Sequence, residues 1–206
     1  GGAQPSSDFV TVRRASVDPA PNVLPGRLQI QSTRIQGQIF EDGAVPATFL
    51  PVTVDPVTGL PSSATHNLMV NSYYVSASSD LIPGVPTLRR KTLMMQGGVM
   101  TIEDQEVAPG VENLQVQFGL DVDQDNTVDR YVNPGDEAYD PNAAGYIPGA
   151  RVITARVWMV VRGLTPEAGL ADNRDYSPGD VDLGAFNDQV RRLQVSKTIL
   201  LRNART

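Results

Sequence analysis

The sequence predicts a mainly antiparallel β protein of the α+β class, with few and short helices. Residues 114–122 alternate apolar and polar side chains with the period of two that is typical of a half-buried strand. The longest β-prone run, RVITARVWMVVR at 151–162, is apolar on both faces at its centre, as in a central strand. The 18 Gly and 16 Pro residues indicate many turns and disfavour long helices.

Seven other segments carry strand patterns, in chain order 8–14, 27–35, 37–40, 66–78, 87–95, 99–107 and 191–203. Turn residues at 81–86 separate 66–78 from 87–95, so these two strands are predicted to form a hairpin. Pro109-Gly110 predicts a further turn. The last segment is rich in Arg and Lys, which suit the exposed edge of a sheet.

The rest of the chain is predicted to be turns and loops within one globular head domain spanning 1–206. Segment 41–65 is a Pro-rich extended segment, because its prolines recur every five residues and rule out a long helix. Segments 133–150 and 163–187 are predicted loops. Two short helices are expected: 165–171, with Thr165 as cap and Pro166 at the first helical position, and 184–192.

Composition narrows the class of protein. A hydrophobic content of 40% with 19% charged residues is typical of a globular chain with a proper core. The net charge of −6 argues against nucleic acid as the main partner. Cysteine is absent, which excludes disulfides and thiol chemistry. No apolar run reaches the roughly 18 residues that a membrane span needs.

The strand 114–122 runs directly into closely spaced carboxylates, which repel one another unless a cation lies among them. The order D-x-D-x-D-N-T-V-D reproduces the first nine positions of an EF-hand-type calcium loop. The predicted metal ligands are the carboxylates of Asp121, Asp123, Asp125 and Asp129 and the backbone carbonyl of Thr127. Calcium is favoured over magnesium, because the donors are oxygens on a flexible loop.

Two positions depart from the EF-hand pattern. Asn126 replaces the usual Gly at position 6, and Asn tolerates positive φ better than other non-Gly residues. Val132 replaces the bidentate Glu at position 12, so water or a carboxylate further along the chain must close the ligand shell. Asp136, Glu137 and Asp140 are the nearest candidates. The alternative interpretation is a solvated acidic hairpin turn without a metal, because Asp and Asn are common turn residues.

Several blocks of the chain resemble the PilW family of type IV pilus minor pilins. In chain order they are NSYYVSASSD, GVPTLRRKTL, EVAPGVENLQVQFGLDVDQDNTVDRYV, RVWMVVRGLTPEAG, RDYSPGD and DQVRRLQVSKTILLRN. The resemblance covers roughly residues 70–206, and agreement of independent blocks in order is more specific than any single motif. The minor pseudopilins of type II secretion are more distantly similar.

The resemblance implies a fold, a cellular localisation and a function. The fold is a pilin-like head domain lacking its long N-terminal helix, which in this family anchors the precursor in the inner membrane of a Gram-negative bacterium. The head is expected in the periplasm and then extracellularly in the pilus. Its implied partners are other minor pilins and a tip adhesin, in a complex that initiates assembly of a pilus for adhesion, twitching motility or DNA uptake. The role is structural, so no enzyme activity and no catalytic residue is expected.

Two other classes of protein compete with this interpretation. Asp121-Val122-Asp123 after a strand is also typical of aspartate-dependent phosphatases, but those need alternating helices that this sequence does not predict. A Ser-His-Asp triad would have to use His66, the only histidine, without a nucleophile motif. A calcium-stabilised β-sandwich that binds carbohydrate or protein is the main alternative. The basic groups Arg89-Arg90-Lys91 and Arg191-Arg192 could contact DNA or the acidic face of a partner, but they are interpreted as residues that keep edge strands soluble.

Overall fold

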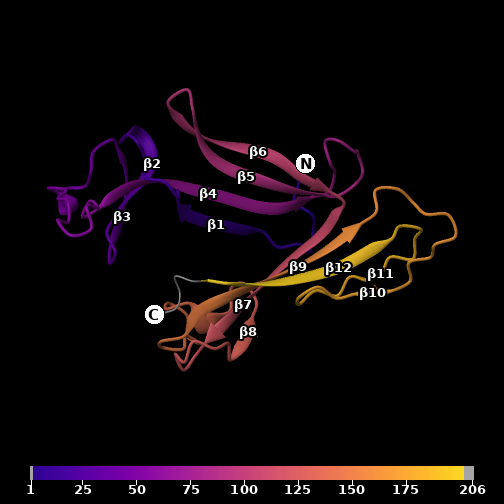
Figure 1. Cartoon of the computed structure of the whole chain (residues 1–206). Helices are drawn as coiled ribbons and strands as arrows, with labels where there is room; N and C mark the ends of the chain where they lie inside the picture. The colour runs from indigo at the N-terminus through magenta and orange to yellow at the C-terminus, as the bar shows by residue number, and fades with distance from the viewer. Residues whose placement is uncertain (1, 202–206) are drawn as a thin grey trace. The chain divides into compact units, whose positions relative to one another are not determined.

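The computed structural model describes residues 2–201 as an almost purely antiparallel β protein (Figure 1). The strands are β1 Val10–Ala15, β2 Pro25–Ser32, β3 Gly37–Asp42, β4 Ala64–Ser76, β5 Thr87–Gln96, β6 Val99–Pro109, β7 Val111–Asp121, β8 Arg130–Val132, β9 Arg151–Arg162, β10 Asp175–Tyr176, β11 Gly184–Ala185 and β12 Arg192–Leu200. The 3-10 helices are η1 Ala47–Phe49 and η2 Glu137–Tyr139. The predicted fold class is confirmed.

The chain divides into two compact units. Within residues 2–201, unit 1 consists of residues 2–10, 73–89 and 106–201, and unit 2 consists of 11–72 and 90–105. Strands β1, β4, β5 and β6 contribute residues to both units. The single head domain expected from the sequence therefore stays a prediction.

A four-stranded sheet in the order β12-β9-β7-β8 forms the centre of unit 1 (Figure 1). The central position predicted for 151–162 is confirmed, because β9 pairs with β7 on one side and with β12 on the other. Strand β12 is the last strand in this order, as the predicted edge strand should be. The predicted strand 191–203 extends to residues 202 and 203, which lie outside the described residues.

Strand β7 is more buried than its alternating sequence predicts. Its apolar side chains fall into two clusters, one around Val111 and Leu114 and one around Leu120. Gln115, predicted on the solvent side of a half-buried strand, is only 1% exposed. Its amide donates to the carbonyl oxygen of Ser6 at 2.7 Å and to Asn113 Oδ1 at 2.9 Å. Because these acceptors replace water, the polar face of β7 can be buried as well.

The second sheet has the order β3-β2-β4-β5-β6, and β1 also pairs with β4. In unit 2, β2 and β3 form a hairpin, so the predicted strand 27–35 ends at Ser32, where the turn begins. Glutamine side chains are buried here too: Gln31 donates to Ser63 Oγ at 2.7 Å. His66 in β4 has its Nδ1 2.9 Å from the carbonyl oxygen of Ser16, which is a backbone contact and not a catalytic triad.

The two predicted short helices are wrong. Residues 165–171 contain turns and no helix, and 184–192 begins with strand β11. The amide of Glu167 bonds to the carbonyl oxygen of Gln189 in place of a helical partner. Asn187 has φ +54°, which a helix cannot accommodate. Over residues 2–201 no helix has the length and apolarity that crossing a membrane would take.

The long connections carry short structured pieces. The segment 41–65 contains η1 and an isolated bridge between Val54 and Pro61. The segment 133–150 contains η2, and 163–187 contains the two-residue strands β10 and β11, which pair with each other. Each of these pieces is too short to be recognised from a periodic sequence pattern.

Candidate functional site

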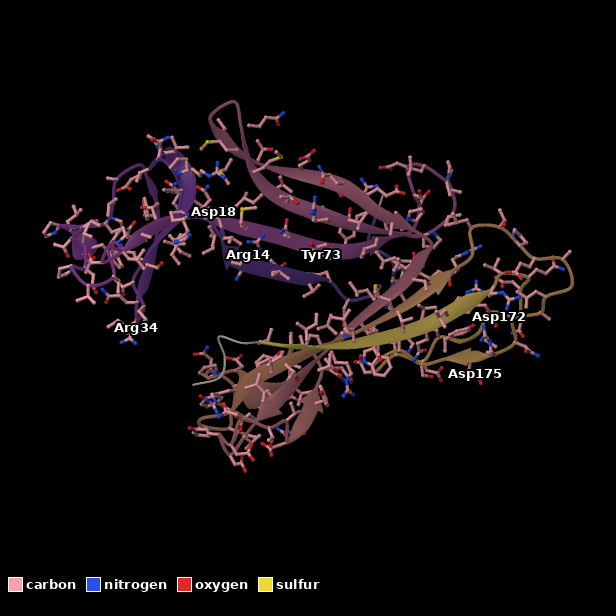
Figure 2. The ribbon with its side chains drawn as sticks, viewed as in Figure 1. Arg14, Asp18, Arg34, Tyr73, Asp172 and Asp175 are labelled. Atoms are coloured by element: carbon pink, nitrogen blue, oxygen red, sulfur yellow. The ribbon has the colours of Figure 1, made fainter. Side chains whose placement is uncertain are left out.

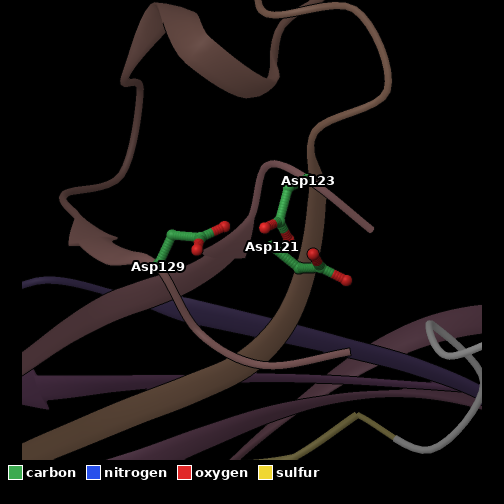
Figure 3. Close-up of side chains that lie close together, drawn as sticks. All are labelled: Asp121, Asp123 and Asp129. Atoms are coloured by element: carbon green, nitrogen blue, oxygen red, sulfur yellow. The ribbon is translucent and has the colours of Figure 1, made fainter. Parts of the chain in front are cut away.

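Three carboxylates gather at the turn between β7 and β8. Asp121 is the last residue of β7, Asp123 follows it in the turn, and Asp129 directly precedes β8. One oxygen atom of each carboxylate lies within 4.8 Å of the others (Figure 3). Calcium–oxygen distances of about 2.3–2.6 Å allow two ligand oxygens of one ion to be up to about 5 Å apart. The spacing of the three carboxylates therefore fits a calcium ion.

The hairpin backbone brings these residues together. Leu120 pairs with Arg130, and the amide of Asp129 donates to the carbonyl oxygen of Leu120 at 2.8 Å. Asn126 has φ +68°, which confirms the positive φ expected at position 6. Gln124 also has φ +67°, which the sequence did not predict. Gln124 and Asn126, with one residue between them, both have left-handed conformations, and the chain therefore turns tightly after β7.

Asp121 is the buried centre of this group. Its side chain is 0% exposed, and Oδ2 accepts hydrogen bonds from Arg151 Nη2 at 2.6 Å and from the Asn126 amide at 3.1 Å. Burial raises the pKa of Asp121, but the hydrogen bonds from Arg151 and the backbone amides outweigh it, so this pKa lies below its ordinary value. The carboxylate is therefore charged at neutral pH.

Within residues 2–201, two buried oxygen atoms at this turn have no hydrogen-bond partner: Oδ1 of Asp121 and Oδ1 of Asn126. A buried acceptor without a partner is costly, so such atoms point to a bound ion or ordered water. Both atoms are oxygens, the donor type that calcium takes. The residues present thus fit the cation that the sequence predicts.

Asp125 and Thr127 bond to each other within the turn. Oδ1 of Asp125 accepts from the Thr127 amide at 2.7 Å and from Thr127 Oγ1 at 2.6 Å, and these bonds lower the pKa of Asp125. Among the described residues, Asp125 is not one of the three gathered carboxylates. These bonds hold the turn, and Asp125 and the Thr127 carbonyl as metal ligands stay predictions.

The candidates for closing the ligand shell make local contacts instead. Asp136 caps η2 by accepting from the Ala138 amide at 2.8 Å. Glu137 accepts from the Gly145 amide at 2.9 Å, and Asp140 accepts from the Asn142 amide at 2.9 Å. None of the three belongs to the carboxylate group found among the described residues.

A second polar centre lies at the opposite end of β9 and was missed by sequence reasoning. The Arg192 side chain is 1% exposed and bonds to Glu112 Oε2 at 2.5 Å and to Asp188 Oδ1 at 2.6 Å. Its guanidinium also lies 3.8 Å from the centre of the Phe186 ring. Arg162 adds a contact to Glu112 Oε1 at 3.3 Å. We call the ion pairs of Arg162, Arg174 and Arg192 with Glu112, Asp172 and Asp188 the arginine network.

The network extends to Asp172 and β10 (Figure 2). Asp172 is buried and accepts from the Tyr176 hydroxyl at 2.8 Å and from Arg174 Nε at 3.0 Å. Burial raises the pKa of Asp172, but the bonds from Tyr176 and the arginines outweigh it and lower this pKa overall. Burial raises the pKa of Tyr176, and its bond to Asp172 raises it further. The hydroxyl of Tyr176 is therefore a fixed donor.

The prediction that Arg191-Arg192 keeps an edge strand soluble is wrong for Arg192. Arg191 is exposed and paired with Glu167 at 2.7 Å, whereas Arg192 is buried. The partner Glu112 lies 80 residues away in the sequence, so no local pattern identifies this pair. One available indication was that RDYSPGD and DQVRRL, two blocks that carry the family resemblance, contain Tyr176, Asp188 and Arg192.

We expect Asp188 to contribute stability that acid removes. The hydrogen bond from Arg192, which outweighs the effect of burial, lowers the pKa of Asp188 from 3.8 to about 2. A lowered folded-state pKa gives stability that is present above about pH 4 and is lost as the pH falls toward 2. Because the side chain is 40% exposed, the expected size is on the order of 1 kcal/mol. Urea unfolding from pH 5 to pH 2 should show a steeper loss in the wild type than in Asp188→Asn, and parallel curves would contradict the assignment.

The comparison with known proteins adds one finding. A family model described as PilW, type IV pilus-assembly protein W, matches residues 72–203, well over half of the chain. No curated protein and no solved structure matches the chain. The matched range includes the four-stranded sheet, the three carboxylates and the arginine network. The resemblance inferred from the sequence blocks is confirmed, and the chain belongs to the PilW family of type IV pilus-assembly proteins.

Proposed function

We propose that this chain is the head of a structural minor pilin that takes part in the tip complex priming type IV pilus assembly and presents an adhesin. Membership of the PilW family connects the chain with type IV pilus assembly at the cell envelope. The match to that family over residues 72–203 is the observation that carries the proposal. The position in a tip complex, the minor-pilin partners and the adhesin are what the proposal adds. The role is mechanical, without a catalytic step.

We also propose that calcium stabilises the turn after β7. The ion would be held by Asp121, Asp123 and Asp129, whose carboxylate oxygens already lie within 4.8 Å of one another. The buried oxygens of Asp121 and Asn126 without partners support a ligand at this place. Three carboxylates and Arg151 carry a formal charge of −2, which a divalent cation balances. Extracellular calcium sites of about 10⁻⁴–10⁻³ M affinity are filled outside the cytoplasm.

A bound ion would act on the surface that the hairpin presents. Without it, carboxylates of like charge repel one another across the turn. With it, the ends of β7 and β8 are joined through the ion as well as through the backbone bonds around Leu120. A fixed hairpin is a better docking surface for a neighbouring pilin, because less conformational freedom is lost on binding.

Pilus counting tests the assembly role. Deleting the gene for this chain in its host is expected to remove most surface pili, and a plasmid copy is expected to restore them. The level of the major pilin in the membrane fraction serves as the control, since a priming defect leaves it unchanged. A deletion strain with the wild-type number of pili would contradict the role in assembly.

The place of the chain in the fibre needs a separate measurement. An epitope-tagged chain that supports assembly is expected to be labelled by gold-conjugated antibody at one end of isolated pili. Co-purification of a large surface protein, dependent on this chain, would identify the adhesin arm of the proposal. Label distributed along the whole fibre would contradict the tip position while leaving the assembly role intact.

A further inference from the structure

A pocket of about 430 Å³ in unit 1 is rich in arginine. Its lining includes Arg162, Arg174, Arg191 and Arg192, with Glu167 and Leu193 beside them. The volume lies within the range of about 300–1,000 Å³ that is usual for ligand pockets. All of these residues follow position 160, so the pocket belongs to one segment of the chain around the ends of β9 and β12. It is separate in sequence from the three carboxylates after β7.

Carboxylates, including the buried Glu112 and Asp172, hold Arg174 and Arg192 in place. Arg192 has its donors occupied by Glu112, Asp188 and a backbone carbonyl. Arg174 is 59% exposed, yet Asp172 and the Tyr176 hydroxyl fix its guanidinium at 3.0 Å and 2.6 Å. A ligand that meets an arginine already fixed in this way loses little affinity to the ordering of side chains.

Two exposed arginines have donors to spare. Among residues 2–201, Arg174 and Arg191 hydrogen-bond through Nε and Nη2 alone. A guanidinium carries five N–H donors, so both N–H groups of each Nη1 remain available. Each Nη1 can therefore donate to an oxygen of an incoming carboxylate.

Glu167 shows that a carboxylate fits here. Its two oxygens accept from Arg191 Nε and Nη2 at 2.9 Å and 2.7 Å. Both side chains are largely exposed, at 63% for Arg191 and 45% for Glu167, and exposed ion pairs are weak. A carboxylate from outside can therefore replace Glu167. Leu193, which is 60% exposed, offers an apolar contact next to it.

We propose that this pocket binds an Asp or Glu side chain of a partner protein, flanked by apolar residues, with Arg174 and Arg191 as the donors and Leu193 as the apolar contact. That the carboxylate comes from a protein rests on the proposed function in pilus assembly. The binding of a carboxylate rests on the pocket alone.

The first experiment tests the pocket with citrate as the probe and triethyl citrate as the uncharged control. In two-dimensional NMR spectra of the whole chain, citrate is expected to shift the signals of Gly163, Glu167 and Arg191 in a saturable, salt-sensitive way. Arg174→Gln and Arg191→Gln should each weaken binding about tenfold. Arg34→Gln, in the exposed turn between β2 and β3 (Figure 2), is the control and should change nothing.

Glu167→Gln gives a prediction of opposite sign. It removes the internal competitor, so citrate is expected to bind about two- to fivefold more tightly. A merely structural Glu167–Arg191 pair would not produce a gain of binding. Saturable shifts that are indifferent to Arg174→Gln, Arg191→Gln and Glu167→Gln, or no saturable shifts at all, would overturn the proposal. Melting curves of each variant establish that it is folded.

The second experiment tests the protein source. The peptide acetyl-Leu-Glu-Leu-Glu-Leu-amide is expected to compete with citrate, and its Gln counterpart is expected to bind at least about tenfold more weakly. If citrate binds at the pocket and the Glu peptide does not, the partner-protein part of the proposal is wrong. Neither result depends on pilus counts, so failure here is distinguishable from failure of the assembly role.

Discussion

Replacing Arg192 by Met is expected to lower the free energy of unfolding by about 3–5 kcal/mol. The Arg192 side chain is 1% exposed and neutralises Asp188 and Glu112, whose side chain is only 9% exposed. Methionine fills much of the same volume but carries no charge, so Glu112 keeps only its longer contact with Arg162 at 3.3 Å. An incompletely paired buried carboxylate is the main cost, because desolvation of a charge must be offset by a partner.

Arg191→Met is the matched control for this prediction. Arg191 precedes Arg192 directly, but its pair with Glu167 is exposed, so its loss is expected to cost much less than the loss of Arg192. Urea unfolding is the suitable measurement, because guanidinium chloride would screen the ion pairs under test. The double variant Glu112→Leu with Arg192→Met should recover part of the loss, since no carboxylate is then stranded at residue 112. If Arg191→Met and Arg192→Met lower the free energy of unfolding equally, the buried ion pair does not stabilise the fold more than the exposed pair.

Calcium is expected to raise the melting temperature by about 5–11 °C at a concentration one hundred times its Kd. Saturation to that degree stabilises the folded state by roughly 2.7 kcal/mol. For a chain of 206 residues each kcal/mol corresponds to about 2–4 °C. With a Kd of about 10⁻⁴ M, 10 mM calcium reaches this point. Melting curves in 10 mM calcium and in EDTA, at matched ionic strength, measure the shift.

Two variants of the acidic turn locate the ion. Asp123→Ala removes one of the three gathered carboxylates and is expected to abolish the shift while the protein stays folded, since Asp123 is exposed. Asp125→Ala, whose carboxylate bonds to Thr127, is expected to keep most of the shift. If Asp123→Ala retains the full gain from calcium, the ligands lie elsewhere. Identical wild-type melting curves with and without calcium would remove the calcium proposal altogether.

The parts of this fold that could be predicted depend on interactions between residues close in the sequence. Strands β4, β5, β7 and β9 were recognisable because alternation and β-branched residues act within a few positions of one another. The left-handed conformation of Asn126 was predictable for the same reason, since it depends on the residue and its immediate neighbours. The helices predicted at 165–171 and 184–192, which do not form, show where local patterns stop being sufficient. Their local patterns favoured helix, but the Glu167 amide bonds to the distant Gln189 carbonyl oxygen.

In the candidate site, too, the features set by nearby residues were predictable and those set by distant residues were not. The carboxylates at 121, 123 and 129 lie within nine residues, so their spacing in the sequence already indicated a shared ion. Only the fold places Arg151 on Asp121, because it depends on the pairing of β7 with β9. The bond of Asp125 to Thr127 spans only two residues, but the sequence pattern did not indicate it.

By itself the sequence determined the β class, the positions of the longest strands, the acidic turn and the family, because each depends on neighbouring residues or on blocks read in order. The tertiary structure alone decided which polar residues are buried. Gln115, Asp121 and Arg192 read as surface residues in the sequence, yet they are 1%, 0% and 3% exposed. A polar side chain can be buried only where hydrogen-bond or ion-pair partners replace water. Those partners, such as Glu112 for Arg192, come from distant parts of the chain.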